Sequence, residues 1–154
     1  MGLLARMREL ARGPERRILG ELAAAYRDEV RMVRQLRLHA ESVPYLSSAP
    51  VLLGLAEQED AHAALLGEEI TRLGGTASAA DTGEPRQGRN YWERLTLDLE
   101  DLRAKTQHYL ELAHHWDIEY PDTAELFRRL AHAEATMGRP LGEMIARSDP
   151  HAAD

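Results

Sequence analysis

Hydrophobic residues recur at steps of three and four through four long segments of the chain, which is the spacing of one face of an α-helix. These segments run from Glu15 to about Glu41, from Pro50 to Leu73, from about Asn90 to Trp116, and from Pro121 to about Arg147. The first of them carries on one face Leu19, Leu22, Tyr26, Val30, Val33, Leu36 and Ala40. No segment alternates apolar and polar residues as a half-buried strand does. The pattern predicts an all-α protein of four helices.

The connections between these helices predict their arrangement. Short turns join the first helix to the second and the third to the fourth, so each pair should form an antiparallel hairpin. Between the hairpins lie the sixteen residues "GGTASAADTGEPRQGR", 74–89, which carry no helical pattern. Such a link reaches about 50 Å when extended, whereas a helix of about 25 residues is roughly 38 Å long. The link can therefore run the full height of a bundle, which predicts two hairpins joined by one long crossover loop.

The dipeptide Gly13-Pro14 is predicted to end a short N-terminal helix, because proline cannot continue the helical hydrogen-bond ladder. This divides the chain into a short amphipathic segment 1–13, a four-helix bundle 14–148 and a C-terminal tail 149–154. The first segment is basic, and we expect it to pack on the bundle. Docking to a membrane surface or to a partner is the alternative for this segment.

Composition removes several classes of function. The chain has no cysteine, which excludes disulfides and thiolate metal sites and fits a reducing cytoplasm. Its net charge of -7 argues against nucleic-acid binding, because proteins of that class neutralise phosphates. No apolar run approaches the roughly 18 residues that a transmembrane helix needs. We therefore expect a cytoplasmic protein without an integral membrane segment.

The two halves of the chain resemble each other. When Leu55 is laid over Leu130, "LAEQEDAHAALLGEEI" (55–70) aligns with "LAHAEATMGRPLGEMI" (130–145), and seven of the sixteen positions are identical. Chance would supply about one such match, so the two halves are predicted to be duplicated hairpins.

Charged residues interrupt the apolar faces at matching positions of this repeat. Glu59 and His62 lie on the face of the second helix, and Glu134 lies on that of the fourth. A buried carboxylate costs several kcal/mol unless it is paired or neutralised. Because Glu59 and His62 are three residues apart on one helix face, both side chains can reach a single ion. Carboxylates and an imidazole in this pattern predict a metal site between the helices.

These segments resemble the ferritin-like superfamily, and in particular its rubrerythrin-like and bacterioferritin-like di-iron four-helix bundles. The resemblance is carried by "AEQEDAHAALL", "HYLELA" and "AHAEATMGRPL", and it covers about Glu15 to Arg147. It implies that each hairpin supplies one glutamate from its first helix and a Glu-x-x-His from its second. It also implies a pair of iron or manganese ions used in oxygen or peroxide chemistry, or in iron oxidation and storage.

Carried over by position, the resemblance makes Glu59 and His62 the first Glu-x-x-His and Glu134 the second bridging glutamate. Met137 stands where the second histidine belongs, so the second half of the site is degenerate. On the third helix the candidate is Asp101, which precedes Glu134 by about the separation that the family uses. On the first helix Tyr26 precedes Glu59 by the same separation, but we favour Glu29, which lies about one turn further along.

The sequence thus predicts a ferritin-like protein that binds iron, in a di-iron or single-iron centre, or manganese. Whether the protein is an enzyme stays open at this point; as an enzyme it would be a di-iron-type oxidoreductase. The alternative is a metal-poor bundle that serves as a structural or partner-binding module. We expect a homodimer, because bundles of this type often pair through their outer faces, and a protein partner is compatible with the alternative function.

Overall fold

In a computed structural model, which describes residues 3–152 and the side chains from residue 12 onward, the chain forms four α-helices. They are α1 (Leu3–Glu41), α2 (Ser48–Arg72), α3 (Tyr91–Trp116) and α4 (Pro121–Ala146). The described residues include no β-strand. The predicted all-α class is confirmed, and the boundaries of α2, α3 and α4 lie within a few residues of the predicted ones.

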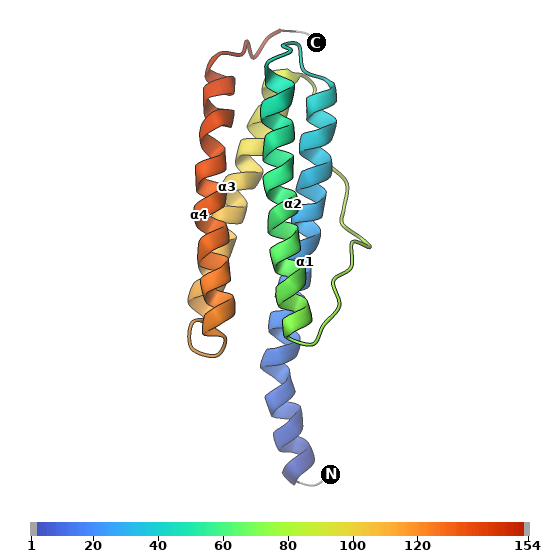
Figure 1. The fold of residues 1–154 in the computed structure, drawn as a ribbon, viewed down its shortest axis with the longest axis vertical. Helices are drawn as coiled ribbons and strands as arrows, with labels where there is room; N and C mark the ends of the chain where they lie inside the picture. Colours follow the sequence, from blue (N-terminus) through green and yellow to red (C-terminus); the bar gives the residue numbers. More distant parts are fainter. Residues whose placement is uncertain (1–2, 153–154) are drawn as a thin grey trace.

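The helices form two antiparallel hairpins that lie side by side (Figure 1). The two helices within each hairpin pack closely together, whereas the hairpins meet through α1 with α3 and through α2 with α4. The link from α2 to α3 runs along the outside of the bundle, from the lower end of α2 to the upper end of α3 (Figure 1). The predicted arrangement of two hairpins joined by a long crossover is confirmed.

The predicted break at Gly13-Pro14 is wrong. Helix α1 is continuous from Leu3 to Glu41 and contains Pro14 in its interior. Proline removes one backbone hydrogen bond, but its fixed φ is itself helical, so the helix can continue through it. The N-terminal part of α1 extends beyond the lower end of the bundle (Figure 1). The amphipathic packing expected of segment 1–13 depends on side chains of residues 1–11, which lie outside the described ones.

The crossover is fastened to the bundle by a buried polar network. Asp98 on α3 accepts hydrogen bonds from His39 Nδ1 and from Gln35 Nε2, both at 2.8 Å. The other ring nitrogen of His39 lies 2.7 Å from the backbone oxygen of Arg86, and Gln35 Oε1 accepts from the backbone N–H of Arg86 at 2.8 Å. His39 is only 1% exposed because the crossover covers it.

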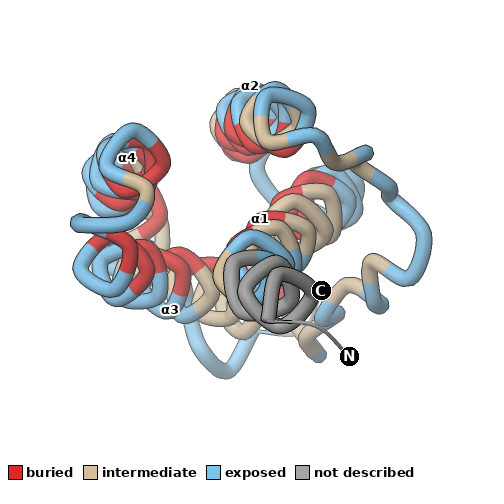
Figure 2. Tube along the Cα trace, turned by 90° about the horizontal axis from the view of Figure 1, so that it is seen from below, coloured by how far each residue is buried: buried red, intermediate tan, exposed pale blue. Residues whose placement is uncertain are grey.

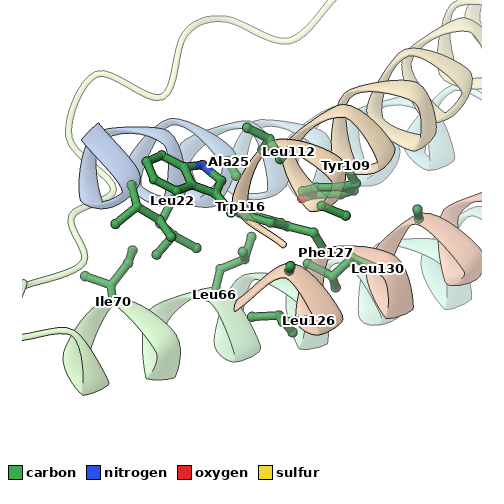
Figure 3. Packing of buried hydrophobic residues seen from close by; sticks show 14 residues of the cluster. Leu22, Ala25, Leu66, Ile70, Tyr109, Leu112, Trp116, Leu126, Phe127 and Leu130 are labelled. Carbon is green, nitrogen blue, oxygen red and sulfur yellow. The ribbon is translucent and has the colours of Figure 1, made fainter. Parts of the chain in front are cut away.

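Buried hydrophobic side chains form two separate clusters along the bundle, and the buried faces of all four helices turn inward (Figure 2). The lower cluster, shown in Figure 3, is built around Trp116, Phe127 and Tyr109. The upper cluster includes Met32, Leu102 and Leu141. A layer of buried polar residues lies between the two, and it is here that the site is found.

Four residues predicted on the inward face of α1 are buried, namely Leu22, Val33, Leu36 and Ala40, but the N-terminal part of that face is turned by about one position. Ile18, Leu22 and Ala25 are buried, whereas Leu19 and Tyr26 are only partly buried. Apolar residues occupy more than half of the circumference of this helix, so periodicity alone left its orientation uncertain. The observed rotation turns the residue one helical turn after Ala25, Glu29, toward the interior.

Candidate metal centre

Four side chains with metal-binding groups meet in the polar layer. They are Glu29 on α1, Glu59 and His62 on α2, and Glu134 on α4, and one ligand atom of each lies within 4.8 Å of the others. The three glutamates are 0% exposed and His62 is 7% exposed. The predicted residues Glu29, Glu59, His62 and Glu134 are thus brought together from three helices.

Helical periodicity places each of these residues between the two apolar clusters. On α1, Glu29 lies between Ala25 of the lower cluster and Met32 of the upper one. On α4, Glu134 follows Leu130 of the lower cluster at the same four-residue step. The apolar layers above and below keep water away from the group, which strengthens electrostatic interactions within it.

The ammonium of Lys105, which comes from α3, lies among the three glutamates. Its Nζ is 2.6 Å from Glu29 Oε2, 2.5 Å from Glu59 Oε2 and 3.0 Å from Glu134 Oε1. The side chain is 5% exposed. An ammonium has three N–H donors, and here each faces a carboxylate oxygen.

Sequence reasoning missed Lys105, although the sequence held a signal for it. Lys105 is the only lysine of the chain, and every other residue among its 19 Lys and Arg is arginine. The ammonium of lysine is a compact point charge, whereas the guanidinium of arginine is planar and larger. A single lysine in a chain that otherwise uses arginine therefore indicates a position where only the ammonium fits. Lys105 also continues the apolar face of α3, three residues after Leu102 and four before Tyr109.

The contacts of His62 and Tyr109 complete the polar layer. His62 Nδ1 lies 2.9 Å from Glu134 Oε1 and 3.5 Å from Glu59 Oε2. The hydroxyl of Tyr109 donates a hydrogen bond to Glu29 Oε1, and its ring stacks on Phe127 with the centroids 5.9 Å apart. Tyr109 therefore connects the polar layer to the lower apolar cluster.

Burial and the ion pairs shift the pKa values of these groups. Burial raises the pKa of Glu29 to about 8, in spite of the opposing charge of Lys105. Burial works to lower the pKa of His62, but its hydrogen bonds to Glu134 and Glu59 raise that pKa to about 9. The pKa of Lys105, which burial alone would lower, is raised by the three carboxylates, so this ammonium stays charged. The metal-free centre thus holds protons on Glu29 and His62 near neutral pH.

The metal-free protein should therefore become less stable as the pH rises. The pKa of Glu29 is about 8 in the folded chain against 4.5 ordinarily, and that of His62 is about 9 against 6.5. Between pH 6.5 and 8 the folded state binds more protons than the unfolded state, on both Glu29 and His62, so stability falls with pH by about 2 kcal/mol per pH unit. Urea unfolding of chelator-treated protein at several pH values checks this. Constant or rising stability over that range would contradict the assignment.

Asp101 does not join the centre, and its predicted placement there is wrong. Its carboxylate is held by Arg31 Nη1 at 3.3 Å, Arg86 Nη1 at 2.8 Å and Gln35 Nε2 at 2.9 Å. Asp101 lies one helical turn before Lys105, on the side of α3 that faces α1 and the crossover. The polar layer meets α3 at Lys105, so the predicted separation from Glu134 was too long by about one turn. The ring of Tyr26 packs against the lower cluster.

The four ligand-type side chains carry donor groups that suit iron or manganese. Three carboxylates and one imidazole are hard and borderline donors that suit these metals. Glu59 Oε1 and Glu134 Oε2 are buried and accept no hydrogen bond from the described residues. A buried acceptor without a partner costs about 1–3 kcal/mol, so a further cation at these oxygens would stabilise the centre. A surface pocket of about 280 Å³ between α3 and α4 reaches Glu134 and offers a way in.

Solved structures with the same fold show what the chain is similar to. A bacterioferritin-related dodecameric thioferritin from Bacteroides fragilis is 16% identical, with a TM-score of 0.78 and 86% of each chain covered. The bacterioferritin of Rhodobacter capsulatus, described with a metal-free dinuclear site and haem iron, is 19% identical with a TM-score of 0.75, covering 89% of this chain and 97% of its own. A hypothetical protein from Pyrococcus furiosus is 18% identical with a TM-score of 0.69, covering 83% of this chain and 88% of its own.

These similarities show that the chain has the ferritin-like four-helix bundle fold. The sequence matches no protein-family model and no curated protein. Within the described part of the chain, none of the helices is both long enough and apolar enough to cross a membrane.

Proposed function

Starting from the ferritin-like fold and a buried Glu/His group, we propose that this protein binds iron or manganese in the middle of its helical bundle. The observation that carries the proposal is the meeting of Glu29, Glu59, His62 and Glu134 within 4.8 Å. Two of these carboxylates have a buried oxygen that accepts no hydrogen bond from the described residues. Similar structures include a bacterioferritin and a bacterioferritin-related protein, which supports iron handling.

In this function, the three glutamates and His62 would hold the ion. When bound, iron or manganese would supply redox chemistry toward oxygen, peroxide or ferrous iron. Tyr109 orients the Glu29 carboxylate through its hydroxyl, and the apolar clusters above and below exclude water from the layer. The pocket between α3 and α4 leaves room for a small reactant to reach Glu134.

Added metal is expected to raise the melting temperature of the chelator-treated protein. A ligand that binds only the folded state stabilises it by RT ln(1 + [L]/Kd), which is about 2.7 kcal/mol at one hundred times Kd. For a chain of this size that corresponds to a rise of about 5–10 °C. Differential scanning fluorimetry with manganese(II), and with iron(II) under anaerobic conditions, measures the rise. Magnesium at the same concentration is the control for a general ionic effect.

A second candidate function is a structural or partner-binding bundle without metal. The observation that favours it is Lys105, whose ammonium already neutralises part of the carboxylate charge through three ion pairs. In this case the melting temperature should not respond to manganese(II) or iron(II), and protein purified from iron-rich cultures should contain no stoichiometric metal.

We also propose that the protein forms homo-oligomers, of which a homodimer is the simplest. One similar protein is a dodecamer, and Leu46 and Ile118 are 96% and 92% exposed, respectively, in the single chain. Light scattering after size-exclusion chromatography gives the oligomeric mass, and a monomer at all concentrations would remove this proposal. A cytoplasmic location is proposed on the absence of cysteine alone.

A further inference from the structure

We infer that the centre holds one metal ion per chain and that the ammonium of Lys105 takes the place of a second ion. This inference rests on the proposed function, since it states how many ions that centre accepts. A centre of this kind is mononuclear, whereas the Rhodobacter capsulatus bacterioferritin is described with a dinuclear site.

The two hairpins present corresponding residues to the centre. The separation along the chain from Glu29 on α1 to Glu59 on α2 nearly equals that from Lys105 on α3 to Glu134 on α4. Lys105 therefore takes in the second hairpin the place that Glu29 takes in the first. At this place the first hairpin offers a carboxylate to a metal, and the second offers a cation instead.

The second hairpin also lacks a metal ligand at the position where the first hairpin has His62. His62 lies three residues after Glu59, and Met137 lies three residues after Glu134. Met137 is 2% exposed and belongs to the upper apolar cluster. A thioether is a soft ligand, poorly suited to iron or manganese. The second hairpin thus keeps only Glu134 as a metal ligand, and Glu134 also belongs to the four-residue group around the first position.

The contacts of Lys105 leave one oxygen of Glu59 and one of Glu134 for a metal ion, whereas the second oxygen of Glu29 accepts from the Tyr109 hydroxyl. Its ammonium binds one oxygen of each of the three glutamates: Oε2 of Glu29, Oε2 of Glu59 and Oε1 of Glu134. The other oxygens of Glu59 and Glu134 are the buried acceptors for which no described residue supplies a hydrogen-bond donor. These two carboxylates can therefore bridge, with one oxygen toward the ammonium and the other toward a metal ion.

The charges of the centre also favour one metal ion per chain. Three ionised glutamates are neutralised by one ammonium and one divalent cation, with His62 uncharged as a ligand. A second divalent cation would leave two unbalanced positive charges in a buried layer, next to an ammonium that repels it. The residues present therefore fit one iron or manganese ion and do not fit two.

Native mass spectrometry of wild-type protein loaded with manganese(II), together with elemental analysis, tests the inference. The expected result is one ion per chain, with the electron paramagnetic resonance spectrum of an isolated manganese(II) ion. Two ions per chain with an exchange-coupled spectrum would overturn the inference and leave the proposed function standing. No bound ion, in wild type and in Glu59→Gln alike, would overturn the proposed function itself.

Two substitutions should create the missing position. The double variant Lys105→Glu/Met137→His is expected to bind two manganese ions per chain, because it supplies a carboxylate and an imidazole where the second hairpin lacks them. Met137→His alone keeps the ammonium and should still bind one. Arg129→Glu makes the same change of charge on the exposed surface of α4 and should also bind one. Two ions in Met137→His would overturn the inference, whether or not the double variant folds.

Discussion

Replacing Lys105 with methionine is expected to lower the melting temperature of the metal-free protein by about 10 °C. The substitution removes the ammonium that lies 2.5–3.0 Å from three glutamates that are 0% exposed. Removing one partner of a buried ion pair costs about 3–5 kcal/mol, because it leaves uncompensated charge in the interior. For a domain of this size, 1 kcal/mol corresponds to about 2–4 °C.

Metal should then compensate for the lost lysine. In Lys105→Met the three carboxylates lack their resident cation, so manganese(II) should raise the melting temperature by more than it does in wild type. Thermal unfolding with and without manganese(II) measures both effects. Arg103→Met, an exposed position on the same helix, is the matched control and should change the melting temperature by at most about 2 °C. A Lys105→Met protein as stable as wild type without metal would contradict the assigned ion pairs.

Glu59→Gln is expected to weaken manganese(II) binding at least about 100-fold. Glu59 is 0% exposed, contacts Lys105 and offers a second oxygen that no described residue uses. The amide has nearly the same shape as the carboxylate but carries no charge, so the fold can persist while a charged ligand is lost. A loss of this size corresponds to about 2.7 kcal/mol of binding free energy. Isothermal titration with manganese(II) gives the dissociation constants of both proteins.

Glu57 supplies the matched control for this substitution. It lies two residues before Glu59 on α2 but is exposed, so Glu57→Gln removes the same charge without touching the centre. Glu57→Gln should bind manganese(II) as wild type does. Equal losses of affinity in the two variants would mean that the metal binds at the acidic surface instead of inside the bundle.

Helical periodicity and the internal repeat predicted the part of the centre that lies on α2 and α4. Glu59, His62 and Glu134 interrupt apolar faces with clear spacing, so their inward direction followed from the sequence. The inward direction of Glu29 was harder to predict, because the apolar residues of α1 cover more than one face. Tyr26 was an alternative candidate for the same position in the centre. The burial of Ile18, Leu22 and Ala25 shows how α1 is turned.

The number of residues between α3 and Glu134 was not enough to predict which residue of α3 meets the polar layer. Asp101 and Lys105 are one turn apart, and a small shift of the second hairpin decides which of them meets the polar layer. A lysine on an apolar face is usually expected to extend toward solvent, so its burial among three carboxylates is visible only when all four helices are assembled. The partners of His39 likewise come from α3 and from the crossover, which are distant from it in sequence.

One metal ion is expected to bind among Glu29, Glu59, His62 and Glu134, while the ammonium of Lys105 takes the place of a second ion. Anomalous diffraction from crystals of the wild-type protein loaded with manganese(II) tests it most directly. The expected result is a single anomalous peak within coordination distance of these four side chains, with the ammonium of Lys105 still in contact with the glutamates. A centre without an anomalous peak, or one with two peaks and Lys105 displaced, would contradict it.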